Sequence, residues 1–165
     1  MKKELPVRKN IRFKGYDYSS PGYYFITIGT KNRVCLFGEI NDGNMILNEY
    51  GNIANDELLK IPFRYDNVKI DNYVIMPNHV HVIVVIEQME RETERIYPFP
   101  TADIPNIIGK YKAGVTRIVG NAFMRSVVWQ DRFHDRIIHN KDEYDYIYHY
   151  IDENPAKWEE DKFYK

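Results

Sequence analysis

Residues 67–86 read NVKIDNYVIMPNHVHVIVVI, and this stretch decides the fold. The segments 67–76 and 79–86 are rich in β-branched and aromatic residues, which is typical of strands. Pro77 and Asn78 separate the two segments, and both residue types favour tight turns. The sequence therefore predicts an antiparallel pair of strands that meet at this turn.

The second of these strands carries two histidines on one face. Successive side chains of a strand point to opposite sides, so His79 and His81 share one side. Val80, Val82 and Val84 share the other and are expected to face the core. Two positions on one side of a strand are about 7 Å apart, and both imidazoles can tilt onto one divalent metal ion. The same spacing also fits two partly exposed strand histidines, so both interpretations stay open.

Outward from this pair, the chain alternates strands and helices. We expect a strand over 23–30, a hairpin of 34–37 and 45–47 around the turn 41–44, a helix over 49–60 stopped by Pro62, a loop over 87–101, a helix over 105–119, a strand within 127–138 and a helix over 141–153. Short antiparallel strands with packed helices predict an α+β fold, and we expect its ferredoxin-like version. Nothing marks a domain boundary, so residues 1–165 are expected to form one domain.

The helix predicted over 141–153 carries a second candidate for chemistry. Tyr146, Tyr150 and Asn154 are spaced four residues apart and therefore share one helix face. A phenol on this face can act as a nucleophile, and an amide oxygen is a hard ligand that favours Mg²⁺ or Mn²⁺. Tyrosine-rich helices also pack their rings half-buried without any catalytic role. Pro155 in addition biases Asn154 away from helical geometry.

Charge is unevenly distributed in this chain, whose formal net charge is −1. Residues 1–34 contain eight basic and two acidic residues, and residues 106–141 contain seven and two. Two basic segments can converge on a phosphate backbone, although two solvated faces give the same pattern. The candidates for nucleic-acid contacts are Arg12, Lys14, Lys110, Lys112, Arg117 and Arg132.

Cysteine content and hydropathy indicate the compartment. Cys35 is the only cysteine, which excludes an internal disulfide and a thiolate zinc site and fits a reducing environment. The sequence has no leader-like start and no apolar run as long as a membrane span. We therefore expect a cytoplasmic protein that does not bind a membrane.

Several motifs together resemble a known family. The setting of the histidine pair, MPNHVHVIVVI, resembles the single-tyrosine transposases among the HUH (histidine-hydrophobe-histidine) nucleases. The chain as a whole resembles the REP-associated tyrosine transposases. The resemblance extends over most of the sequence, through the segments 16–18, 22–27, 36–38, 76–86, 129–138 and 150–155.

This resemblance implies a reaction and a set of site residues. Members of the family bind single-stranded or hairpin DNA on a ferredoxin-like sheet, and they cleave and rejoin it through a 5′-phosphotyrosine. Carried onto this chain, the resemblance implies Tyr150 as the nucleophile and His79, His81 and Asn154 as ligands of Mg²⁺ or Mn²⁺. It leaves both a monomer and a homodimer open.

Two other functions fit parts of the pattern. A domesticated hairpin-DNA-binding protein would keep this fold without transposition. A nucleotide hydrolase of the histidine-triad type also uses alternating histidines, but that chemistry needs a third one where this chain has Ile83. The presence of His79, His81 and Tyr150 together favours the DNA-cleaving enzyme.

Overall fold

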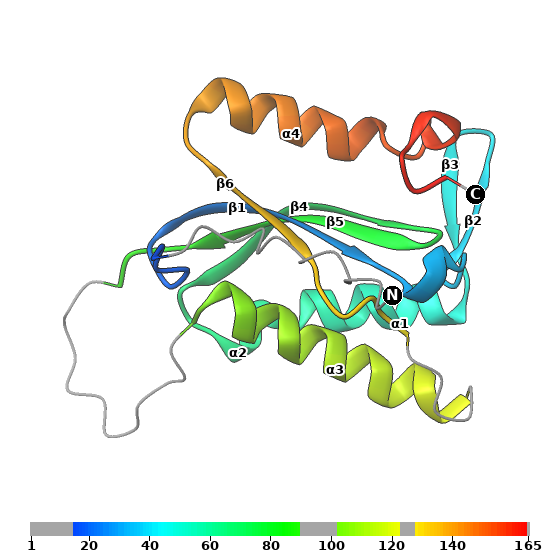
Figure 1. Ribbon diagram of the computed structural model, residues 1–165, viewed down its shortest axis with the longest axis horizontal. Coiled ribbons are helices and arrows are strands. Elements are labelled where there is room, and N and C mark those ends of the chain that lie inside the picture. The colour runs from blue at the N-terminus through cyan, green and yellow to red at the C-terminus, as the bar shows by residue number, and fades with distance from the viewer. Residues whose placement is uncertain (1–14, 90–101, 123–127, 165) are drawn as a thin grey trace, which may run out of the picture.

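The computed structural model describes residues 15–89, 102–122 and 128–164, and it confirms the α+β fold (Figure 1). At its centre lies a four-stranded sheet in the order β4-β5-β1-β6, in which all neighbours are antiparallel. These strands are β1 (Gly22–Gly29), β4 (Val68–Met76), β5 (His79–Ile86) and β6 (His134–Ile138). One helical connection precedes β4 and another precedes β6, which is the ferredoxin-like arrangement expected from the sequence.

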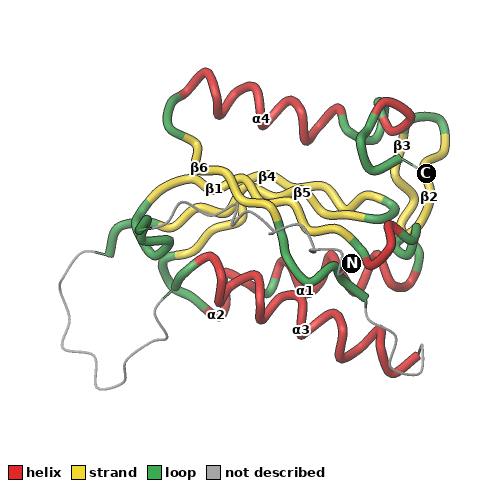
Figure 2. The backbone as a smooth tube through the Cα atoms, viewed as in Figure 1, coloured by secondary structure: helices red, strands yellow, loops and turns green. Residues whose placement is uncertain are grey.

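Helices cover both faces of the sheet (Figure 2). On one face lie α1 (Glu49–Leu59), α2 (Ile61–Arg64) and α3 (Ile104–Ala122), and on the other lies α4 (Lys141–Glu153). Both sides of β5 are therefore buried along its whole length. Within the described ranges, no helix has the combination of length and apolar character needed to cross a bilayer.

The two faces of β5 serve different purposes. Val80, Val82 and Val84 belong to the large core that the sheet forms with α1 and α3, as expected from the alternation. On the opposite face, Ile83 and Val85 pack with apolar residues of α4 in a smaller cluster. The smaller cluster occupies only part of this face, and the histidine end of β5 lies beyond it.

A separate hairpin is formed by β2 (Gly38–Asn41) and β3 (Asn44–Leu47). Its turn residues Asp42 and Gly43 have φ values of 48° and 72°. Positive φ at both central positions is the type I′ geometry for which Asp-Gly is favoured. The turn predicted from the sequence is thus confirmed.

One predicted boundary is wrong and one is confirmed. The segment 34–37 is not a strand, because the backbone of Phe37 bonds outside the hairpin: its N–H donates to the carbonyl of Pro77, and its carbonyl accepts from Asn48. The pairing of β2 with β3 begins only after this residue. The helix expected over 49–60 is confirmed as α1, which ends at Leu59. Pro62 lies beyond it in the first turn of α2, where the missing N–H of a proline is not needed.

Candidate metal centre and nucleophile

The histidines of β5 lie side by side on the sheet face that α4 covers. The ring centroids of His79 and His81 are 4.5 Å apart. Their side chains are 0% and 1% exposed, so the interpretation as two partly exposed strand residues is wrong. A buried imidazole pair needs partners for four ring nitrogens.

The Nδ1 atoms of both rings have such partners. His79 Nδ1 lies 2.9 Å from Oδ1 of Asn78, and His81 Nδ1 lies 2.8 Å from Oγ1 of Thr27 on β1. The amide of Asn78 has a fixed orientation, because its nitrogen donates to the carbonyl of Phe163 at 2.8 Å. An amide oxygen only accepts, so His79 carries its proton on Nδ1 and keeps a lone pair on Nε2. Hydrogen-bonded Nδ1 atoms of this kind orient histidines that bind metals through Nε2.

Helix α4 brings two further side chains to the Nε2 atoms. The Tyr150 hydroxyl lies 3.4 Å from Nε2 of His81, and the side chain of Asn154 is buried beside it. Asn154 has helical angles, φ −57° and ψ −43°, despite the proline that follows. The four-residue alignment of Tyr150 and Asn154 therefore holds, because buried contacts outweigh the local bias.

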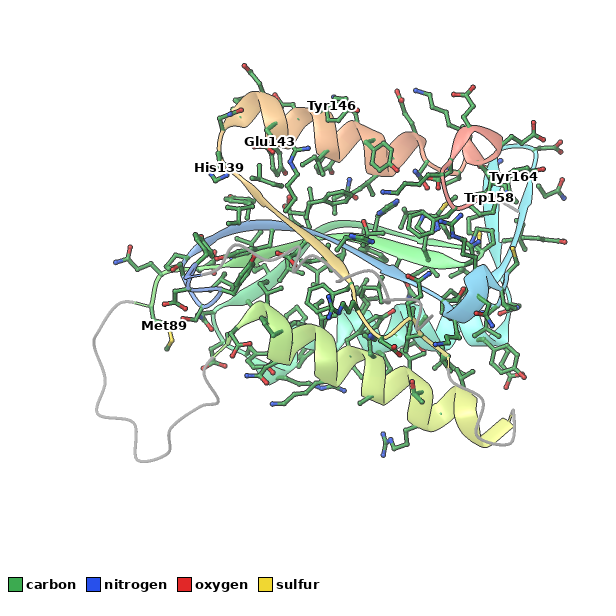
Figure 3. The ribbon with its side chains drawn as sticks, in the orientation of Figure 1. Met89, His139, Glu143, Tyr146, Trp158 and Tyr164 are labelled. Atoms are coloured by element: carbon green, nitrogen blue, oxygen red, sulfur yellow. The ribbon has the colours of Figure 1, made fainter. Side chains whose placement is uncertain are left out.

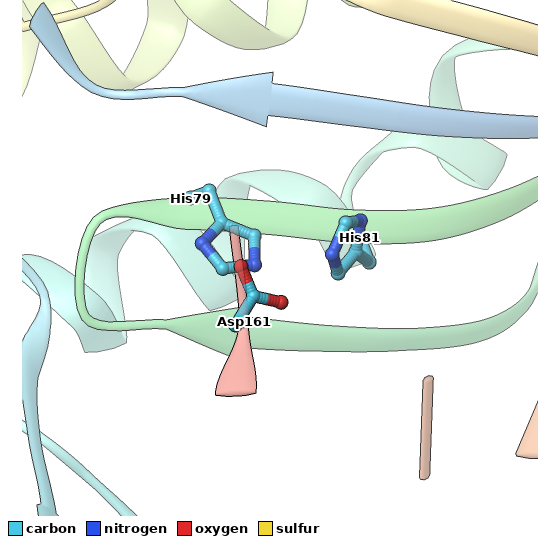
Figure 4. Close-up of side chains that lie close together, drawn as sticks. All are labelled: His79, His81 and Asp161. Atoms are coloured by element: carbon cyan, nitrogen blue, oxygen red, sulfur yellow. The ribbon is translucent and has the colours of Figure 1, made fainter. Parts of the chain in front are cut away.

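A carboxylate completes the cluster, and it comes from the turn after α4. Oδ2 of Asp161 accepts hydrogen bonds from the Tyr150 hydroxyl at 3.3 Å and from Nδ2 of Asn154 at 3.1 Å. Within the described residues, one ligand atom from each of His79, His81 and Asp161 lies within 4.8 Å of the others (Figure 4). The side chains thus converge on one point.

Asp161 was missed by the sequence analysis. It follows a 3-10 turn at Trp158–Glu160, outside any periodic element, and two other acidic residues precede it closely. No spacing distinguishes it from Glu159 or Glu160. Only the path of the chain after α4 brings it to the histidines.

Two buried atoms of the cluster that lack hydrogen-bond partners are suited to bind a divalent metal. Nε2 of His79 and Oδ1 of Asn154 are buried and have no hydrogen-bond partner within the described parts of the chain. Buried polar atoms nearly always have a partner, and both of these are metal-donor types. Two imidazole nitrogens with an amide and a carboxylate oxygen suit a borderline-to-hard divalent ion.

The electrostatics of the cluster favour neutral histidines and a protonated phenol. Burial lowers the pKa of His79 to about 4 and that of His81 well below 6.5, so both are neutral at physiological pH, the form that binds metals. Burial, together with the charge of Asp161, raises the pKa of Tyr150 to about 12. Positive charge near the phenol is therefore needed to favour the phenolate.

The other tyrosines of α4 do not reach this cluster. The hydroxyl of Tyr144 donates to Asp71 at 2.6 Å, and its neighbour Tyr148 packs in the smaller apolar cluster. Tyr146 is 68% exposed on the solvent side of α4 (Figure 3). Of these residues only Tyr150 places its hydroxyl beside the histidines.

Comparison with known proteins identifies a relative in sequence. The chain is 40% identical to an uncharacterized protein from Haemophilus influenzae (strain ATCC 51907 / DSM 11121 / KW20 / Rd) over 167 residues, which cover 95% of this chain and 93% of that protein. The chain belongs to the family of this Haemophilus protein. No family model matches the sequence.

The fold of this family member is that of known transposases. A REP-associated tyrosine transposase bound to a REP hairpin superposes with a TM-score of 0.63 and 21% identity, over 89% of this chain and 73% of that one. A candidate transposase from Deinococcus radiodurans R1 superposes with a TM-score of 0.50 and 18% identity, over 86% and 95%. The similarity expected from the sequence is thus confirmed as a shared fold over most of the chain.

The basic candidates on α3 lie apart from the histidines. Lys110, Lys112 and Arg117 are on α3, across the sheet from the cluster, and Arg132 is exposed just before β6. The ammonium group of Lys112 is held in place, since it donates to the carbonyls of Gln130 at 2.8 Å and Asp131 at 3.2 Å. Arg12 and Lys14 lie outside the described residues.

Proposed function

We propose that this protein is a metal-dependent, single-tyrosine transposase that cleaves and rejoins single-stranded, hairpin-forming DNA. The observation that carries the proposal is the Tyr150 hydroxyl 3.4 Å from Nε2 of His81, within a buried cluster of metal-donor atoms. The fold it shares with a transposase bound to a REP hairpin supports hairpin DNA as the substrate class.

In this proposal His79, His81, Asn154 and Asp161 hold one divalent ion, Mg²⁺ or Mn²⁺. The bound ion would neutralise charge that develops on the phosphate oxygens during the reaction. Asp161 adds a negatively charged ligand to the three that the sequence suggested. Two neutral imidazoles alone leave the ion's charge uncompensated, so this carboxylate is expected to strengthen binding.

Tyr150 performs the covalent step. Its oxygen forms a bond to phosphorus while the bond between phosphorus and the 3′-oxygen breaks. The phenol loses its proton, and the departing 3′-oxygen takes up a proton to become a hydroxyl. The products are a 5′-phosphotyrosine and a free 3′-end. One phosphoester bond replaces another, so a second 3′-hydroxyl can reverse the step and join two strands.

The test is a search for this covalent product. The protein is incubated with end-labelled hairpin oligonucleotides in Mn²⁺, in Mg²⁺ or in excess chelator, and is then run on a denaturing gel. A metal-dependent protein–DNA adduct supports the proposal. Hairpin binding without an adduct in either metal would instead support the domesticated DNA-binding protein.

The hydroxyl of Thr27 is expected to matter for metal affinity. It lies opposite His81 in the register of β1 and β5 and holds the Nδ1 atom of that ring. Thr27→Val removes the hydroxyl with little change of volume, and loss of such a partner typically costs about tenfold or more in metal affinity. Calorimetric titration with Mn²⁺ measures this loss. Thr27→Ser is the matched control and should bind like the wild type; equal affinities of all three proteins would contradict the prediction.

The basic face of α3 is expected to contribute to the salt dependence of DNA binding. Lys110→Ala combined with Arg117→Ala should reduce the slope of log K against log salt by about 0.7–0.9 for each phosphate that is no longer neutralised. Fluorescence anisotropy at several salt concentrations gives the slope. Lys69→Ala is a suitable control, since this exposed lysine is paired with Glu87. An unchanged slope in the double variant would place the DNA elsewhere.

A further inference from the structure

A small pocket opens at the proposed metal cluster. Its volume is about 240 Å³, and Tyr150, Asn154 and Asp161 form part of its wall. The remaining wall comes from charged residues of the last turn of α4 and the segment after it: Glu153, Lys157, Glu160 and Lys162. A phosphate that is attacked by Tyr150 is expected to enter this pocket, because the proposed nucleophile lines it together with two of the proposed ligands.

The two lysines of the pocket differ in their partners. The ammonium of Lys157 forms an ion pair with Glu153, one turn earlier. Lys162 has no carboxylate within ion-pair distance among the residues that the structure describes, and its ammonium lies 5.2 Å from the ring centre of Phe163. Of the two lysines of this pocket, Lys162 is therefore the one without an ion pair within the described parts of the chain.

Lys162 shares this pocket with the proposed nucleophile and with two of the proposed ligands. It follows Asp161 directly in the chain, and both residues line the pocket together with Tyr150 and Asn154. A group bound in this pocket therefore meets Lys162 as well as these three residues. A lysine repels a cation and attracts an anion, and a bound metal ion attracts the same anion. The charges of this pocket therefore favour an anionic group such as a phosphate.

The main chain at Lys162 is fixed independently of its side chain. Its carbonyl accepts a hydrogen bond from Nη1 of Arg33 at 3.0 Å. The carbonyl of the next residue, Phe163, accepts from Asn78, and the ring of Phe163 stacks on that of His79 with centroids 4.4 Å apart. A change of the Lys162 side chain therefore leaves the anchoring of this segment intact.

We propose that Lys162 binds a non-bridging oxygen of the scissile phosphate, as a phosphate-binding residue of the cleavage reaction. The inference rests on the proposed function. A lysine binds phosphate as a point charge, and a cation placed where negative charge develops stabilises the transition state more than the ground state.

The test compares Lys162→Gln with Lys162→Arg and with Lys157→Gln as the matched control from the same pocket. Two quantities are measured: the single-turnover rate of adduct formation at saturating hairpin DNA, and the affinity for Mn²⁺ in the absence of DNA. Lys162→Gln should slow the adduct by about 100-fold, as loss of one charge-stabilising donor does. Lys162→Arg should retain most of the rate, and Lys157→Gln should change it little.

The metal affinity separates phosphate binding from a structural role. Removal of a positive charge beside the cluster should leave Mn²⁺ binding unchanged or make it tighter, while the rate falls. A parallel loss of Mn²⁺ affinity in Lys162→Gln, or an unchanged rate, would overturn the inference while the proposed function stands. A wild type that forms no adduct would overturn the proposed function, and this inference with it.

Discussion

Tyr150→Phe is expected to abolish the covalent protein–DNA adduct completely while hairpin binding is retained. Only the phenol oxygen can form the phosphotyrosine, and the ring itself is kept. The hydroxyl makes two long hydrogen bonds, of 3.4 Å to His81 and 3.3 Å to Asp161. Their loss should cost no more than about 0.5–1.5 kcal/mol of stability each. A denaturing gel with labelled DNA reports the adduct, and a mobility-shift assay reports binding.

Tyr146→Phe is the matched control for this variant. Tyr146 lies one turn earlier on the same helix and is 68% exposed, away from the histidines. The Tyr146→Phe variant should form the adduct at the wild-type level. If Tyr150→Phe still migrates as a covalent complex, the nucleophile is another tyrosine, and a complex lost in Tyr146→Phe would identify it.

Replacement of either histidine by alanine should eliminate both cleavage and metal binding. His79 and His81 each offer a ring nitrogen close to Asp161, and within the described parts of the chain no further histidine joins this group. Both side chains are buried, so the alanine variants should lose about 1–3 kcal/mol of stability. The fold should survive, because the valines on the other face of β5 remain in the core.

Thermal melting with and without Mn²⁺ tests this second prediction apart from activity. A ligand that binds only the folded state at 100 times its dissociation constant adds about 2.7 kcal/mol. For a chain of this length, that raises the melting temperature by about 5–10 °C. The wild type should show this increase, and His79→Ala and His81→Ala should not. Full cleavage in excess chelator would contradict the metal mechanism, and loss of any melting transition in both variants would indicate structural histidines.

Periodicity in the sequence was enough to predict the elements that carry the site. The β-branched composition of 79–86 predicted the strand, and the alternation of faces along it correctly assigned the valines to the core. The helix over 141–153 was predicted with its observed bounds, because Pro155 cannot continue a helix. Both predictions use only residues that are close together in the sequence, so no knowledge of tertiary contacts was needed.

Features that depend on long-range packing could not be predicted. The alternation in β5 gave the face of the histidines, but not the burial that α4 and the segment after it impose. Asp161 is held at the cluster by contacts between residues far apart in sequence, such as the stacking of Phe163 on His79 and the hydrogen bond from Asn78 to the carbonyl of Phe163. The segment 34–37 has a strand-like composition, but Phe37 packs in the core and lies outside the hairpin ladder.

The four proposed ligands come from two different parts of the fold. The two histidines belong to β5, a central strand paired on both sides and covered on both faces. Asn154 and Asp161 belong to a helix end and to the segment after it, which lie outside the sheet. We therefore expect a change of the preferred ion to evolve more readily by mutation of the peripheral pair than by mutation of the buried histidines.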